Sequence, residues 1–233
     1  MLIGEMPKSS KVAIYVDGFN LYYGALKGTP YKWLDLSQLA RNFLGGMGNI
    51  VKIRYFTAKV YPPPWDPDIN IRQEIYLRAL QTLPNLEIHY GKFKPRTRRG
   101  FYLSGPGRCL ACKGELVEIE APEEKGSDVN LAAYLIYDAA RDLYDTAWVV
   151  SNDSDLATPI RLVRGYFKKR VGIVLYGSML TRQQRAPQYV SQELLRATGG
   201  LHKFITEDLL RNSLFPDAFH DRRGREHKKP RAW

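Results

Sequence analysis

Four aspartates occupy the positions in this sequence where a chemical site would need them: Asp17, Asp128, Asp153 and Asp155. Asp17 directly follows the apolar run Val12–Val16, and Asp153 and Asp155 come just after a second apolar run, Ala147–Val150. Asp128 begins the helical stretch that leads into that second run. Short apolar runs rich in β-branched residues are typical of strands buried on both faces. The acids therefore lie at the ends of the elements most strongly predicted to form a core.

Carboxylates gathered in one place repel one another unless something neutralises them. Protonation can relieve this repulsion for one or two of the groups, whereas a divalent cation can relieve it for all of them. Oxygen-only ligands favour hard ions, so the expected cofactor is Mg²⁺ or Mn²⁺. Such an ion activates water for attack on a phosphodiester. The chemistry that this set of acids predicts is metal-dependent hydrolysis of a nucleic acid.

Strands and helices alternate along the chain. The apolar spacing predicts strands over 11–16, 50–60, 86–90, 146–150, 170–176 and 203–205, and helices over 34–44, 70–83, 129–143, 156–167 and 188–197. This order predicts βαβ units and an α/β fold with a central, mostly parallel sheet flanked by helices. Ligands bind beyond the carboxyl ends of such strands, which would bring the four acids to one rim. Asp138, Asp142 and Asp145 are interpreted as solvated helix-face and turn acids and are left out of the site.

Each candidate residue also has a purely structural role open to it. Asp17 can form a turn before the following glycine. Asp128 can cap the helix that it precedes, and Asp153 or Asp155 can cap the next one. Asn20 can cap a helix or orient a water molecule. The joint placement of the acids at one rim, rather than any single residue, supports the functional interpretation.

Charge points to the same class of partner. The 233 residues include 35 Lys and Arg against 24 Asp and Glu, a net charge of +11, which favours nucleic acid. We expect an N-terminal extension (1–10), one domain (11–206) with an insertion at about 92–125, and a basic tail (207–233) whose last part, from residue 221, is disordered because it lacks apolar periodicity. No run is long enough to cross a membrane and the N-terminus lacks the apolar centre of a secretory signal, so a cytoplasmic location is expected.

The insertion is strongly basic. Seven Lys and Arg and no acid lie between Lys92 and Lys113, with aromatic residues among them. Cations that contact phosphates and rings that stack on bases suit single-stranded nucleic acid, so Arg96, Arg98 and Arg99 are candidate substrate-binding residues. A solvated basic loop is the alternative. Lys125, three residues before Asp128, is placed to approach a phosphate, whereas Tyr22 and Tyr23 are assigned to the core.

The insertion also holds the two cysteines of the chain, Cys109 and Cys112. Their spacing is that of a zinc ligand pair, but tetrahedral zinc needs two more ligands. The other candidates show no second pair at ligand spacing: His89, His202, His220 and His227. We therefore favour two free thiols, while zinc shared between copies in a homo-oligomer stays open.

Three segments together resemble the NYN domain family, a branch of the PIN-like ribonucleases. They are Tyr15-Val-Asp17-Gly-Phe-Asn20, Glu124-Lys-Gly-Ser-Asp128-Val-Asn130 and Val150-Ser-Asn-Asp153-Ser-Asp155-Leu. The resemblance spans about residues 11–206. It implies a compact α/β sandwich and endonucleolytic cleavage of RNA, with Mg²⁺ or Mn²⁺ held by Asp17, Asp128, Asp153 and Asp155. It also implies supporting, substrate-binding roles for Asn20 and Ser151.

Two other functions stay open at this point. A haloacid-dehalogenase-like phosphatase also places an acid after its first strand, but it needs a second acid two residues later, where this chain has Phe19. A non-catalytic RNA-binding or adaptor module could retain the acidic pocket without cleaving. A dinucleotide-dependent reductase is disfavoured, because the chain lacks the glycine-rich phosphate cradle after its first strand.

Overall fold

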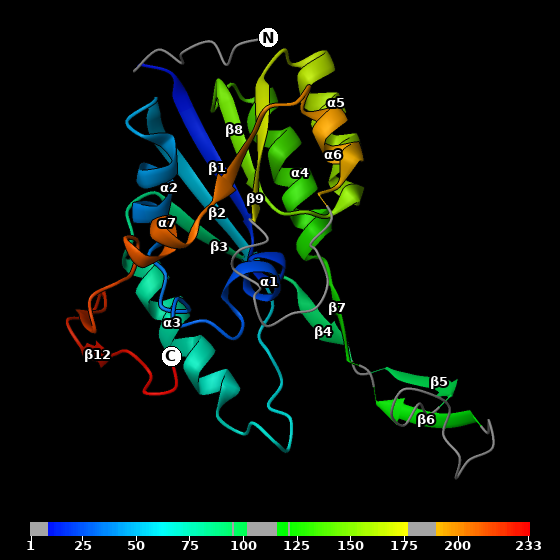
Figure 1. Ribbon diagram of the computed structural model, residues 1–233, viewed down its shortest axis with the longest axis vertical. Coiled ribbons are helices and arrows are strands. Elements are labelled where there is room, and N and C mark those ends of the chain that lie inside the picture. Colours follow the sequence, from blue (N-terminus) through cyan, green and yellow to red (C-terminus); the bar gives the residue numbers. More distant parts are fainter. Residues whose placement is uncertain (1–8, 95, 102–115, 121, 177–189) are drawn as a thin grey trace.

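Six parallel strands form the central sheet of the computed structural model (Figure 1), which describes residues 9–94, 96–101, 116–120, 122–176 and 190–233. The strands are β1 (Lys11–Asp17), β2 (Asn49–Thr57), β3 (Leu86–Tyr90), β8 (Thr146–Val150), β9 (Arg170–Tyr176) and β10 (His202–Ile205). Their order is β10-β9-β8-β1-β2-β3, and every neighbouring pair is parallel. The chain therefore winds outward in two directions from β1, and the switch point lies between β1 and β8.

Helices cover both faces of this sheet, which confirms the predicted α/β class (Figure 1). They are α2 (Leu36–Leu44), α3 (Ile69–Thr82), α4 (Ser127–Ala140), α5 (Ala157–Tyr166), α6 (Gln192–Ala197) and α7 (Glu207–Arg211). Side chains alternate along β1, so that Val12, Ile14 and Val16 join the core beneath α2, α3 and α7. Ala13 and Tyr15 join the opposite core, beneath α4, α5 and α6. Every described helix is too short or too polar to span a lipid bilayer.

Short helical turns follow the two central strands. The helix α1 (Gly18–Leu21) begins at the end of β1 and continues into the π-helical turn η1 (Tyr22–Leu26). A 3₁₀ turn, η2 (Ser154–Leu156), follows β8. Gly18 is required at this junction, because a Cβ there would lie 2.6 Å from the Tyr55 ring and hydroxyl oxygen and 2.8 Å from the Phe56 carbonyl oxygen.

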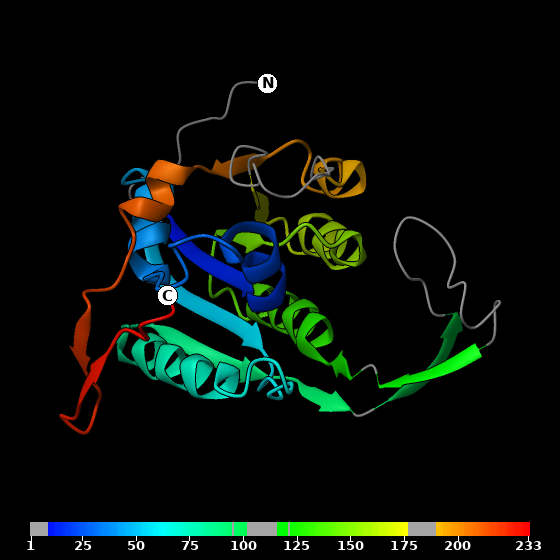
Figure 2. The ribbon, with the colours of Figure 1, turned by 60° about the horizontal axis from the view of Figure 1, so that its bottom comes forward.

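The insertion is a β-ribbon in its described residues rather than the solvated loop that the sequence left open as an alternative. Strand β4 (Lys92–Lys94) pairs antiparallel with β7 (Glu123–Lys125), and β5 (Thr97–Phe101) pairs with β6 (Leu116–Glu120). Figure 2 shows this β-ribbon extending away from the sheet and its helices. Backbone pairing satisfies the N–H and C=O groups that an open loop would leave to water. Cys109 and Cys112 lie outside the described residues.

The expectation of a disordered chain end is wrong. Strand β11 (Ala218–His220) pairs antiparallel with β12 (Glu226–Lys228), and Asp221 between them accepts hydrogen bonds from the backbone N–H groups of Arg223 and Arg225. The Trp233 ring packs with its centroid 5.6 Å from that of Tyr76 and 6.2 Å from that of Trp33. A few large aromatic contacts, which hydrophobic periodicity does not detect, order this polar segment.

Asp138, which we predicted to be solvated, is a buried residue of α4 with an exposed fraction of 2%. It accepts hydrogen bonds from the Tyr15 hydroxyl (2.7 Å) and from Arg54 Nε and Nη2 (2.7 and 2.8 Å). Arg54 also contacts Glu87 and His89. The carboxylate is tolerated in the core because a buried guanidinium neutralises it. Asp142 and Asp145 are on the surface, as expected, and pair with Lys11 and Lys169.

Candidate active site

The carboxyl end of β1 and the carboxyl end of β8 meet at the switch point of the sheet. The register pairs Val16 with Val150, which sets Asp17 beside Ser151. Crevices at the switch points of parallel sheets are the usual ligand sites of doubly wound folds. The predicted convergence of the β1 and β8 segments is therefore present.

Asp17 is held in one orientation by its neighbours. Its Oδ1 accepts a hydrogen bond from the backbone N–H of Asn20 (2.9 Å), which makes it the N-cap of α1. Its Oδ2 accepts a hydrogen bond from the Ser151 hydroxyl (3.1 Å). Only 5% of the residue is exposed. The turn-forming role and the site role considered for Asp17 are thus compatible.

Ser151 and Asn20 shape the loop that carries the other acids. Ser151 is fully buried, and its Oγ accepts a hydrogen bond from the Asp153 backbone N–H (3.1 Å). Asn20 Oδ1 accepts hydrogen bonds from the backbone N–H of Asn152 (3.0 Å) and from the Tyr176 hydroxyl (3.2 Å). These contacts give both residues a positioning role. The part played by Tyr176 was not predicted, because nothing in the sequence relates the end of β9 to Asn20.

Asp153 caps the turn η2 by accepting a hydrogen bond from the Asp155 backbone N–H (3.0 Å), and Asp155 is exposed. Asp128 lies in the first turn of α4. Its side chain does not cap this helix, so the capping role that the sequence left open for Asp128 is absent. The residue before the helix is Gly126, whose φ of 101° suits glycine. Glu124, rather than Asp128, accepts hydrogen bonds from the Ser127 N–H and hydroxyl (3.2 and 2.8 Å). The carboxylate of Asp128 is therefore not used in capping its own helix.

Mutual repulsion links these carboxylates. The pKa of Asp17 is raised to about 6, first by burial and then by the charges of Asp128 and Asp153, against the hydrogen bonds from Asn20 and Ser151, which lower it. The pKa of Asp128 is also raised, first by burial and then by Asp153, Glu124 and Asp155. Acids from β1, α4 and the loop after β8 therefore affect one another across a single rim.

Glu124 is a further acid at this rim, and the predictions from the sequence did not include it in the site. It comes from β7, at the base of the β-ribbon, and its charge acts on Asp128. Glu124 lies three residues before Ser127, close enough along the chain to accept hydrogen bonds at the start of α4, and this spacing is the signal that could have identified it. No hydrophobic pattern in the sequence predicts the short strand that carries it.

The donor chemistry of the rim fits a hard divalent cation, since it offers only carboxylate and other oxygen groups. As the side chains stand, however, no three His, Cys, Asp or Glu residues within the described ranges lie close enough together to hold a metal ion. The charge coupling of Asp17 with Asp128 and Asp153 supports the fit. Capture of a cation at this rim would therefore need carboxylates to move towards it, or water to complete its coordination.

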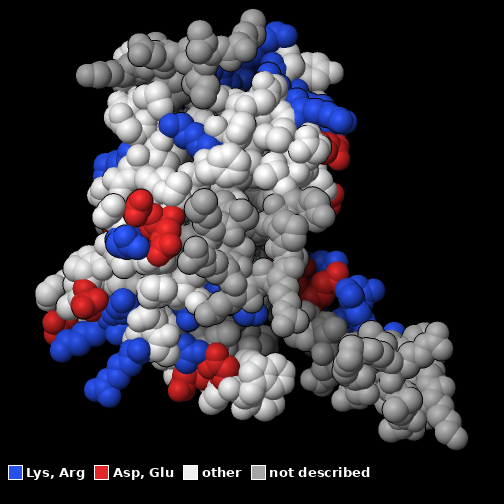
Figure 3. Space-filling view, viewed as in Figure 1, with Lys and Arg blue, Asp and Glu red and all other residues white. Residues whose placement is uncertain are grey.

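The cations predicted to bind substrate lie on the β-ribbon, and most of them are paired. Arg96 contacts Glu123, Arg98 lies 3.4 Å from the same carboxylate, and Lys125 lies 2.8 Å from it. Arg99 lies 3.1 Å from Glu118. The antiparallel pairing brings acids of β6 and β7 beside the basic strands, and Figure 3 shows red and blue side chains in contact where the β-ribbon leaves the sheet. Lys92 and Lys94 form no ion pair within the described part of the chain.

The β-ribbon contacts the site through aromatic rings. Phe93 of β4 packs edge to face on Phe19, two residues after Asp17, with ring centroids 5.7 Å apart. This contact packs β4 against α1, the helix that Asp17 caps. It also shows that the position where a haloacid-dehalogenase-like phosphatase needs its second acid holds a packed aromatic ring.

The order of the sheet and the acids at its switch point define an α/β domain with an acidic rim, a class that includes the PIN-like nucleases. The NYN domain family model matches residues 11–198, and the chain belongs to that family.

Two known proteins are similar to this chain. The curated protein 6-hydroxy-3-succinoylpyridine 3-monooxygenase HspA of Pseudomonas putida is 32% identical over 188 residues, covering 71% of this chain. The match spans 59% of that protein, so it concerns about three-fifths of the relative's length. A crystal structure of a Vibrio parahaemolyticus protein of unknown function has a TM-score of 0.51 and 19% identity, covering 92% of this chain and all of the other. That likeness concerns the fold alone.

Proposed function

We propose that this protein is a metal-dependent endoribonuclease that hydrolyses phosphodiester bonds in RNA. The observation that carries the proposal is that Asp17 and the loop of Asp153 meet through Ser151 at the switch point of the sheet, where the charges of Asp128 and Asp153 also act on Asp17. Natural chains retain such repulsion at functional sites more often than elsewhere. Membership of the NYN domain family and a net charge of +11 support a nucleic acid as the substrate.

Asp17 and Asp153 would hold the Mg²⁺ or Mn²⁺ ion, and Asp128 and Asp155 would complete the acidic pocket. When bound, such an ion lowers the pKa of water and offsets negative charge at the reacting phosphate. Ser151 and the Asn20 N–H keep the Asp17 carboxylate facing the rim, through hydrogen bonds of 3.1 and 2.9 Å. Asn20 Oδ1 fixes the loop that carries Asp153 by accepting from Asn152. Lys92 and Lys94, on β4 at the base of the β-ribbon, would contact phosphates of the bound RNA.

The decisive experiment incubates labelled single-stranded RNA and DNA with the protein and Mn²⁺, Mg²⁺ or EDTA. We expect RNA cleavage with either ion and none with EDTA. Asp17→Asn and Asp153→Asn should each lower the rate by at least about a hundredfold, since each removes a negative ligand. Asp142→Asn is the matched control, because Asp142 is exposed and pairs with Lys11 and Lys169.

A metal-binding measurement separates loss of the ion from loss of the fold. Mn²⁺ should raise the unfolding temperature of the parent protein and of Asp142→Asn, but not that of Asp17→Asn. Full activity in Asp17→Asn would overturn the mechanism. RNA binding that is unchanged by EDTA, with no cleavage under any ion, would instead establish the non-catalytic RNA-binding module.

The similarity to HspA supports a second candidate, a monooxygenase acting on a small hydroxypyridine. Such a reaction consumes dioxygen and a two-electron reductant, which a hydrolase does not. Oxygen uptake with 6-hydroxy-3-succinoylpyridine and a reduced nicotinamide cofactor would favour this candidate. Cleavage of RNA in the absence of oxygen would favour the nuclease.

A further inference from the structure

A cavity separate from the acidic rim opens beside α1. Its volume is about 290 Å³, and it lies between α1 and η1, the end of β2, the start of α3 and the residues around Trp233. Gly18 lines it, so its wall begins one residue after Asp17. A volume of this order suits a ligand with a single ring system.

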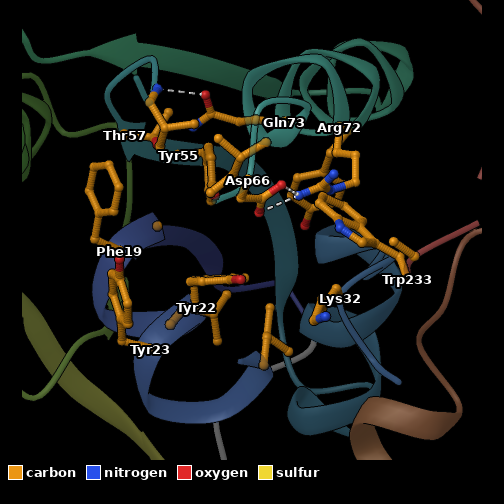
Figure 4. Close-up of a pocket in the computed structure, with 17 residues that line it drawn as sticks. Phe19, Tyr22, Tyr23, Lys32, Tyr55, Thr57, Asp66, Arg72, Gln73 and Trp233 are labelled. Atoms are coloured by element: carbon orange, nitrogen blue, oxygen red, sulfur yellow. Dashed lines mark hydrogen bonds and ion pairs between the residues drawn. The ribbon is translucent and has the colours of Figure 1, made fainter. Parts of the chain in front are cut away.

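Six of the side chains that line the cavity are aromatic. Figure 4 shows Phe19 and Tyr23 at one end, Trp233 at the other and Tyr22 between them. The Tyr22 and Tyr23 rings meet edge to face, with centroids 5.3 Å apart. Tyr23 is 57% exposed, so its assignment to the core is wrong. Faces and edges of several rings around one space favour a flat aromatic guest, which can stack on one ring and meet the edge of another.

Positive charge gathers at the Trp233 end of this cavity. Arg72 and Lys32 lie there (Figure 4). Arg72 Nη2 donates to both carboxylate oxygens of Asp66, each at 2.5 Å. Lys32 has no hydrogen bond or ion pair to any described residue. Two cations against one acid leave the cavity with one uncompensated positive charge.

A hydroxyl donor faces the same space. Tyr22 lines the cavity, and its hydroxyl forms no hydrogen bond within the described part of the chain. Burial raises the pKa of Tyr22, so the group stays protonated and able to donate at neutral pH. A half-buried hydroxyl and an unpaired ammonium are the groups that a built site reserves for a polar substituent.

We propose that this cavity binds a planar aromatic ring that carries one negatively charged substituent. The ring lies among Phe19, Tyr22 and Tyr23, and the anion meets Lys32. The inference goes beyond the nuclease function, because it concerns binding alone and needs no metal. The anion can be the carboxylate of a free aromatic acid or the phosphate of a nucleotide, and the experiment distinguishes these sources.

Calorimetric titration of the metal-free full chain with four probes tests this site. Benzoate carries the ring and the charge, benzamide carries the ring alone, cyclohexanecarboxylate carries the charge on a puckered ring, and uridine 5′-monophosphate is the nucleotide. We expect benzoate or the nucleotide to bind at least about tenfold more tightly than benzamide, because a charged partner is lost in the amide. Cyclohexanecarboxylate should bind several-fold more weakly than benzoate, because it cannot stack.

Lys32→Gln should weaken binding of the preferred anion about tenfold, whereas Lys59→Gln should leave it unchanged. Lys59 is the matched control because it is exposed on the neighbouring segment and does not line the cavity. Tighter binding of the nucleotide, displaced by benzoate, would identify the cavity as a nucleotide site, and preference for benzoate would identify a site for free aromatic acids. Equal binding of benzoate and benzamide, no binding of any probe, or equal effects of the two lysine variants would overturn the proposal.

Discussion

Asp17 combines opposing influences in one side chain. Burial and two neighbouring acids favour its protonated form, while hydrogen bonds from Asn20 and Ser151 favour its ionised form. The balance raises its pKa to about 6, above the ordinary value of 3.8 for an aspartate. Ionising this carboxylate at neutral pH therefore costs the metal-free protein free energy, and a bound cation would offset that cost.

This imbalance predicts how stability depends on pH. Between about pH 4 and pH 6 the folded state binds more protons at Asp17 than the unfolded state does, so its contribution to the free energy of unfolding falls as pH rises. Asp17→Asn removes the penalty and should raise the free energy of unfolding by on the order of 2 kcal/mol at about pH 7.5. Asparagine also caps helices well.

Urea unfolding of the metal-free protein at about pH 4 and pH 7.5 measures the effect. The gain from Asp17→Asn should shrink to a few tenths of a kcal/mol at the lower pH. If Asp17→Asn lowered the free energy of unfolding equally at both pH values, Asp17 would stabilise the fold through its hydrogen bonds, and ionising it would not cost free energy. The same titration predicts that nuclease activity rises as pH increases through about 6, since the ionised carboxylate is the required form.

Asp138 is also a buried acid, but hydrogen bonds from Tyr15 and Arg54 occupy its carboxylate. Asp138→Asn should lower the free energy of unfolding by about 3–5 kcal/mol, because it leaves the buried Arg54 guanidinium without its counter-charge. Asp142→Asn should change it by about 0.5 kcal/mol or less, since Asp142 is exposed. Denaturant unfolding of both variants at neutral pH checks this contrast. Equal effects would mean that Arg54 is neutralised by Glu87 alone.

At the scale of elements, the pairing of strands in the β-ribbon neutralises several of its cations. Seven cations in one stretch of sequence suggest a strongly basic surface, but the returning strands place Glu118 and Glu123 beside them. Lys92 and Lys94 lie on β4, and no ion pair within the described residues compensates their charge. We therefore shift the expected phosphate contacts from Arg96, Arg98 and Arg99 to the lysines of β4.

Salt dependence of RNA binding distinguishes these two sets of cations. Lys94→Gln should weaken binding and reduce the slope of log affinity against log salt concentration by about 0.7, the value for one phosphate contact to a single strand. Arg96→Gln should leave the slope nearly unchanged, because the charge of Arg96 is offset by Glu123. Fluorescence anisotropy with Asp17→Asn as the background avoids cleavage during the measurement. A larger slope change for Arg96→Gln would restore the arginines as the phosphate contacts.

At the scale of the whole molecule, the chain end closes one side of the fold. Trp233 packs on Trp33 and Tyr76, and it also lines the aromatic cavity. Trp233→Ala should lower the free energy of unfolding by about 2 kcal/mol, less than for a fully buried tryptophan. Trp65→Ala, at a position that is 85% exposed, should change it by less than about 0.5 kcal/mol. Thermal unfolding of the two variants provides the comparison, and equal midpoints would show that the chain end does not stabilise the domain.

The strands and helices of the central α/β sheet, and the placement of the acids at the ends of those elements, were determined by the sequence itself, whereas the strands of the β-ribbon and of the chain end were not predicted. Apolar runs such as Val12–Val16 can be buried only as strands between helical layers, and parallel strands carry the residues after them to one edge. The order of the strands then made Asp17 and the β8 loop neighbours. The local hydrophobic pattern was sufficient to predict these elements, because apolar side chains are buried at regular intervals along each strand and helix.

Contacts between distant segments were decided only by the tertiary structure. The burial of Asp138 depends on Arg54, 84 residues away, and the ordering of the chain end depends on Trp33 and Tyr76. The neutralised arginines of the β-ribbon and the aromatic cavity likewise arise from side chains that the fold brings together. Such pairings have no periodic signature, because their free energy comes from a partner whose identity a local stretch of sequence does not contain.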